Sequence, residues 1–159
     1  MTLVRPILEY AVDLWLPFHK NQLIALESVQ RRFTKRIHGF YNLSYTERLQ
    51  QLQTPSLWWR FARGSLITTF KVLVENYGGD AARSMFTLSN INFTRGHPLK
   101  LARPQVRYTR TLNFFTYRVI DTWNSLPHFV VGASSANEFK NKLDHYVINH
   151  TAWYYHFIE

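Results

Sequence analysis

Residues 54–79, TPSLWWRFARGSLITTFKVLVENYGG, decide the fold class. Apolar side chains recur here every three or four positions, which is the spacing of an amphipathic helix. Thr54 and Pro55 form a start signal, with Thr54 as the N-cap and Pro55 at the first helical position. Gly78-Gly79 supplies the stop. The stretch therefore predicts a long helix over about residues 56–76.

Two further helices are expected immediately before this one. The first follows an N-cap at Asn21 and ends at Gly39. Ser44 and Glu47 form a capping box that opens the second helix, which runs through Leu52. The apolar stripe of the first helix consists of Leu23, Leu26, Val29 or Gln30, Phe33 and Ile37.

The second half of the chain first loses and then regains helical spacing. Residues 87–111 have no helical period, so we expect an extended basic segment there, with short strands around 99–101. Helical spacing returns over 112–127. A second capping box, Ser135 with Glu138, opens a last helix and completes a C-terminal helix pair.

These patterns together predict a mainly α fold. A helix over residues 6–15 is expected ahead of the others, because Pro6 suits a first turn and Pro17 ends it. A chain of 159 residues fits one structural domain. Its regions would be a helical part at 1–78, a basic extended connection at 79–111, C-terminal helices at 112–150 and an aromatic tail at 151–159.

The composition excludes several classes of protein. Hydrophobic residues make up 46% and aromatic residues 16% of the chain, which favours a packed core over a disordered chain. The absence of cysteine excludes a disulfide scaffold and a thiolate metal site. The histidines follow no metal-binding motif, so neither a metal nor a cofactor is expected. No stretch suits a membrane span or a secretory signal, which favours an intracellular location in cytoplasm or nucleus.

The net charge of +9 is concentrated in two windows without acids. Residues 28–46 hold four bases and residues 81–120 hold seven. Such patches favour a polyanion as partner, with solvated basic faces as the alternative. Bases spaced along extended backbone can follow phosphates, and Tyr108 could stack on a base. The predicted nucleic-acid-binding residues are Arg31, Arg32, Lys35, Arg36, Arg95, Lys100, Arg103, Arg107, Tyr108 and Arg110.

The tryptophans divide into one core residue and one candidate interface. Trp123 lies on the apolar stripe of its segment and is predicted to be buried. Trp58 and Trp59 are adjacent and cannot share one helix stripe, so one of them should be exposed. An exposed tryptophan there would mark an interface.

Several stretches occur in a fixed order that is shared with one family. They are LVRPILEYA (3–11), LESVQRRFTK (26–35), NLSYTERL (42–49), PSL (55–57), TRGHPLKL (94–101), NFFTYRV (113–119) and WNSLP (123–127). The series resembles the thumb and post-thumb part of the reverse transcriptases of non-LTR retrotransposons, of the jockey-like and chicken-repeat-like LINE type. One departure is Ser65, where the family usually has an acidic residue.

This resemblance implies a helical thumb-like bundle that holds a template–primer, either RNA or an RNA–DNA duplex. It also implies that the polymerase palm, with the metal-binding carboxylates, belongs to the parent protein and precedes this part. The acids of this chain are dispersed and include no adjacent pair, so we expect a non-catalytic fragment of an RNA-directed DNA polymerase. The alternatives are a helical protein-interaction module and a functionless relic of a retroelement.

Overall fold

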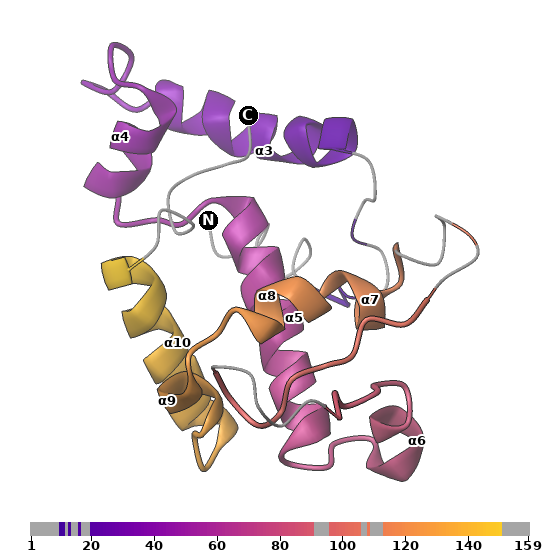
Figure 1. The fold of residues 1–159 in the computed structure, drawn as a ribbon. Coiled ribbons are helices and arrows are strands. Elements are labelled where there is room, and N and C mark those ends of the chain that lie inside the picture. The colour runs from indigo at the N-terminus through magenta and orange to yellow at the C-terminus, as the bar shows by residue number, and fades with distance from the viewer. Residues whose placement is uncertain are drawn as a thin grey trace. The chain divides into compact units, whose positions relative to one another are not determined.

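The computed structural model describes residues 10, 11, 13, 16, 20–90, 96–105, 108 and 113–150. As the sequence predicts, the fold is mainly α, and the described residues contain no strand. The tail at 151–159 and most of the predicted helix over 6–15 lie outside the described residues. The helices are α3 (Lys20–Lys35), α4 (Tyr45–Gln51), α5 (Leu57–Leu73), α6 (Gly79–Arg83), α7 (Phe115–Arg118), α8 (Ile120–Asn124), α9 (His128–Val131) and α10 (Ala136–His150) (Figure 1).

Contacts divide the chain into two compact units, and the boundary lies inside α5. The first unit holds residues up to Phe61 and from Val147 onward, and the second holds Ala62–Tyr146. α5 therefore contributes its first turn to one unit and its remainder to the other. This grouping cuts across the regions drawn from the sequence at 1–78, 79–111 and 112–150.

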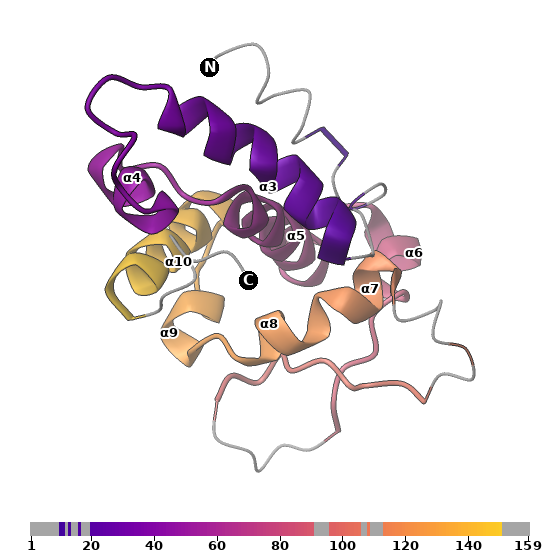
Figure 2. The same ribbon diagram turned by 90° about the horizontal axis from the view of Figure 1, so that it is seen from above.

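In the first unit, a loop after α3 turns the chain back into α4 (Figure 2). The predicted capping box at the start of α4 is confirmed. The Ser44 Oγ accepts a hydrogen bond from the Glu47 N–H at 3.3 Å, and the Glu47 carboxylate accepts one from the Ser44 N–H at 2.7 Å. These bonds also lower the pKa of Glu47. Two of the N–H groups that a helix start leaves unpaired are thereby satisfied.

The N-cap of α5 lies two residues after the predicted one. The predicted N-cap, Thr54, donates its hydroxyl to the Leu52 carbonyl and so does not cap the helix. Ser56 takes this role, because its Oγ accepts the N–H of Trp59 at 3.2 Å. The local signal of a helix start was correct, but a second hydroxyl closer to the apolar run provides the cap.

The other end of α5 comes before the predicted glycine stop. α5 ends at Leu73, whose carbonyl accepts a hydrogen bond from the Arg83 guanidinium at 2.8 Å. The chain turns at Gly78, which has a φ of +82° in the left-handed region that favours glycine. The turn leads into the short helix α6.

In the second unit, α10 runs antiparallel to α5, as Figure 1 shows. The Arg63 guanidinium of α5 forms a two-pronged pair with the Asp144 carboxylate of α10, at 2.6 and 2.7 Å. Phe70 stacks on Phe139 with ring centroids 4.4 Å apart, and both side chains are fully buried. Trp123 joins this core, as predicted, with no exposed surface.

Two carboxylates, those of Glu138 and Glu75, help to cap the start of α10. Ser135 accepts the N–H of Glu138 at 3.3 Å, so half of the predicted capping box is present. The Glu138 carboxylate binds the N–H and hydroxyl of Ser134 instead of returning to Ser135. Glu75, just beyond α5, accepts the Ala136 N–H at 2.6 Å. An acid from another part of the unit thus helps to cap α10.

Where the structure describes the extended segment, it contains one antiparallel bridge, between Leu88 and Leu101, in place of short strands. The amide side chain of Asn124 pairs with both backbone groups of Leu101 at 2.8 Å. The indole of Trp123 donates to the Leu99 carbonyl at 2.7 Å. The segment is therefore held by side chains of α8, and the helix predicted over 112–127 is divided into α7 and α8.

Candidate nucleic-acid interface

Helix α3 buries polar side chains and exposes apolar ones. Glu27, Gln30 and Thr34 are 2%, 9% and 0% exposed. Val29 and Phe33 are 54% and 51% exposed. The predicted apolar stripe is therefore wrong at Val29 and Phe33, whereas Gln30, the alternative to Val29, is buried.

The reason for this rotation of α3 is a set of hydrogen bonds to the start of α5. The two carboxylate oxygens of Glu27 accept the N–H groups of Leu57 and Trp58, each at 3.2 Å. The Gln30 amide donates to the Pro55 carbonyl at 3.0 Å. Buried polar groups must find such partners, and helix N–H groups favour a negative charge. These bonds fix which face of α3 points inward and leave Val29 and Phe33 outside.

Tyr45 of α4 completes the contacts of the Glu27 carboxylate by donating its hydroxyl to it. Burial raises the pKa of Glu27, while the hydrogen bonds from Tyr45, Leu57 and Trp58 act against this rise. The sequence analysis did not predict this set of hydrogen bonds around the Glu27 carboxylate. The available signal was an acid next to Leu26 on an otherwise apolar stripe.

Arg31 belongs partly to this supporting layer. Its guanidinium carbon lies 4.9 Å from the centre of the Tyr45 ring, and that of Arg48 lies 5.5 Å from it. Arg48 is buried and donates to the Arg31 carbonyl at 3.1 Å. Cation–π contacts of this kind position an arginine as well as stabilise it. Arg31 therefore has a structural role beside any role in binding.

Three exposed bases lie at the end of α3 and in the turn that follows it, and we call them the α3 cationic face: Arg32, Lys35 and Arg36. Arg32 is held by Ser28, with its Nη2 3.2 Å from the Ser28 hydroxyl and its Nε 3.3 Å from the Ser28 carbonyl. Lys35 and Arg36 form no ion pair with any residue that the structure describes. The one acid of α3, Glu27, is buried, so no carboxylate neutralises this face from the same helix.

The second predicted basic set belongs to the other unit. Arg103 is exposed and forms an ion pair with Asp121, also exposed. Lys100 is half-buried, and Tyr108 is 72% exposed. Arg95, Arg107 and Arg110 lie outside the described residues. Each set is therefore a separate candidate, and the α3 cationic face is the one whose cations lack a described acidic partner.

The proposed tryptophan interface needs correction. Trp59 is 0% exposed, so it cannot form part of a surface. It shares a helix stripe with Leu66 and Phe70, which are buried as well. Trp58 is half-buried, and its backbone N–H is bound by Glu27.

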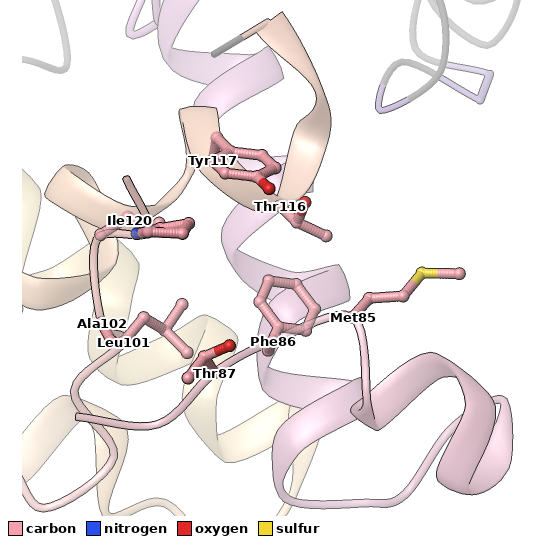
Figure 3. Close-up of a pocket in the computed structure, with 9 residues that line it drawn as sticks. Met85, Phe86, Thr87, Leu101, Ala102, Thr116, Tyr117 and Ile120 are labelled. Carbon is pink, nitrogen blue, oxygen red and sulfur yellow. The ribbon is translucent and has the colours of Figure 1, made fainter. Parts of the chain in front are cut away.

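The second unit contains a small hollow that opens to solvent. Figure 3 shows the rings of Phe86 and Tyr117 on two sides of it. Its volume is about 80 Å³, whereas pockets that bind small molecules measure roughly 300–1,000 Å³. The described residues also contain no group of three histidine or acidic side chains that could hold a metal ion. Among the described residues, the small hollow and the lack of a metal-binding group therefore leave the α3 cationic face as the best-supported binding site.

None of the helices in the described part of the chain combines the length and the apolar character that crossing a membrane requires. Comparison with family models, curated proteins and solved structures found no match. The resemblance to a retrotransposon family therefore depends on the sequence motifs alone.

Proposed function

We propose that this chain binds the backbone of nucleic acid, without catalysis, as the thumb and post-thumb part of a non-LTR retrotransposon reverse transcriptase. The observation that carries the proposal is the α3 cationic face, where Arg32, Lys35 and Arg36 are exposed and α3 has no exposed acid. Cations presented in this way neutralise phosphates and release counterions, which gives sequence-tolerant binding.

The motif series supports the same helix. LESVQRRFTK covers residues 26–35 and thus the middle and end of α3. NLSYTERL covers residues 42–49 and supplies Tyr45 and Arg48, which lie against the Arg31 end of α3. The two motifs together supply Arg32, Lys35 and the layer that supports them. In this proposal the ligand is RNA or an RNA–DNA primer–template.

In this proposal the chain binds the nucleic acid, and the palm of the parent protein catalyses polymerisation. Polymerisation needs carboxylates that hold two metal ions close together. The acids with the clearest roles in this structure are structural. Glu27 and Glu75 bind the first turns of α5 and α10. The rival proposal, a protein interface at Trp58 and Trp59, is weakened because Trp59 is buried.

Binding of a labelled RNA–DNA primer–template, followed by fluorescence anisotropy, tests the proposal. The triple variant Arg32→Gln, Lys35→Gln, Arg36→Gln should bind at least about tenfold more weakly at low salt. Its matched control is Lys71→Gln, Lys140→Gln, Lys142→Gln, which removes the same charge outside the predicted residues. The control should bind nearly as well as the unmodified chain. Equal losses in both variants, or no binding by the folded unmodified chain, would overturn the proposal.

A further inference from the structure

We propose that the α3 cationic face selects single-stranded nucleic acid, with Phe33 as the residue that stacks on an unpaired base. This inference rests on the proposed function, because it uses the same cations. It adds the class of ligand, which charge alone does not specify. The juxtaposition that carries it is a solvent-exposed aromatic ring beside the exposed bases at the end of α3.

The position of Phe33 follows from helix geometry. Val29, Arg32 and Phe33 are spaced i, i+3 and i+4, so their side chains are neighbours on one side of α3. Arg36 follows in the turn after α3, where its N–H donates to the Phe33 carbonyl at 3.1 Å. All four are exposed. About half of the Phe33 side chain lies in solvent. Its exposed part lies on the side of α3 that carries Arg32.

Phe33 is held in this outward position by the buried face of α3. Glu27 and Gln30 bind the start of α5, and Thr34, the residue after Phe33, is fully buried. Turning Phe33 inward would break the Glu27 and Gln30 bonds and expose Thr34. The exposed ring is therefore a property of the folded unit, and it is available to a ligand without rearrangement.

The charge around the ring indicates an anionic occupant. Phe33 shares its side of α3 with Arg32, Arg36 follows in the next turn, and α3 exposes no acid. Single-stranded nucleic acid offers both features that this surface fits, namely phosphates and the open faces of unpaired bases. In a duplex the base faces are covered by their neighbours, so only the phosphates remain for α3. A stacked base accounts for about a five- to hundredfold gain in affinity.

The test compares two ligands and three proteins. The ligands are a labelled RNA of about 12 nucleotides, a length within the usual site sizes, and its duplex with complementary DNA. The proteins are the unmodified chain, Phe33→Ala, and Phe33→Tyr as the conservative variant that keeps an aromatic ring. Unlabelled polyglutamate serves as an acidic competitor without bases.

We expect the unmodified chain to prefer the single strand. Phe33→Ala should weaken single-strand binding by about fivefold or more and change duplex binding less than twofold, while Phe33→Tyr restores the preference. Equal effects of Phe33→Ala on both ligands, no effect on either, or competition by polyglutamate as strong as by RNA would overturn this inference. Duplex binding that depends on the cations but not on Phe33 would leave the proposed function standing. Absence of binding to both ligands would remove both proposals.

Discussion

The carboxylate of Glu27 in α3 accepts the backbone N–H of Leu57, the first residue of α5, at 3.2 Å. The first turn of α5 contains no acid of its own, so Glu27 supplies the negative charge that this helix end favours. The bond joins two helices through a polar group at a position where the sequence pattern suggests apolar packing. It also determines which side chains α3 shows to solvent.

Replacing Glu27 with Gln should therefore destabilise the folded chain. The amide keeps one acceptor oxygen but points a donor toward backbone N–H groups, which leaves a buried polar group unsatisfied. We expect a loss of about 1–3 kcal/mol in the free energy of unfolding, measured with urea. Asp80→Asn, at an exposed site, is the control and should change stability by less than about 0.5 kcal/mol. Similar losses in both variants would contradict the role assigned to Glu27.

The outward position of Phe33 predicts a contrast between two phenylalanines. Phe33→Ala should change the free energy of unfolding by no more than about 0.5 kcal/mol, because the ring is exposed. Phe139→Ala should cost about 3–5 kcal/mol, because Phe139 is fully buried against Phe70. Thermal or urea unfolding of both variants distinguishes the residues. A large loss for Phe33→Ala would mean that α3 packs with the opposite rotation.

The start of α10 predicts a dependence of stability on acid pH. Hydrogen bonds from Lys142 and Ser134 lower the pKa of Glu138 from 4.5 to about 2. Because the pKa is lower in the folded chain, the carboxylate stabilises the fold above pH 4.5 and loses this effect as the pH falls toward 2. The difference in stability between the unmodified chain and Glu138→Gln should therefore shrink over that range. A difference that stays constant with pH would contradict the assigned contacts.

Local signals in the sequence predicted much of the fold. The capping box of Ser44 and Glu47 was correct because its partners lie within one turn, and Trp123 was correctly placed in the core by its helical spacing. The rotation of α3 was not predictable in this way. It depends on bonds from Glu27 to residues 57 and 58, which are distant in sequence, and periodicity counts such an acid as an interruption.

The candidate site was likewise predictable only in part from local sequence. The charge pattern predicted an exposed group of Arg31, Arg32, Lys35 and Arg36, because bases off an apolar stripe remain in solvent. The last three are exposed, whereas Arg31 is half-buried beside Tyr45. It did not identify Phe33 as part of their surface, since a phenylalanine at helical spacing is ordinarily a core residue. The prediction that Trp58 or Trp59 is exposed was wrong for a related reason. Which of two adjacent tryptophans is buried depends on the partner that covers the helix.

The salt dependence of binding tests the central claim, that the α3 cationic face contacts phosphates, most directly. The affinity for an RNA–DNA duplex would be measured from about 50 to 200 mM salt for the unmodified chain and for Arg32→Gln, Lys35→Gln, Arg36→Gln. If all three side chains neutralise phosphates, the slope of log affinity against log salt should be smaller in the variant by about 2–3. Identical slopes for the two proteins would contradict the account, because the phosphates would then be bound elsewhere on the chain.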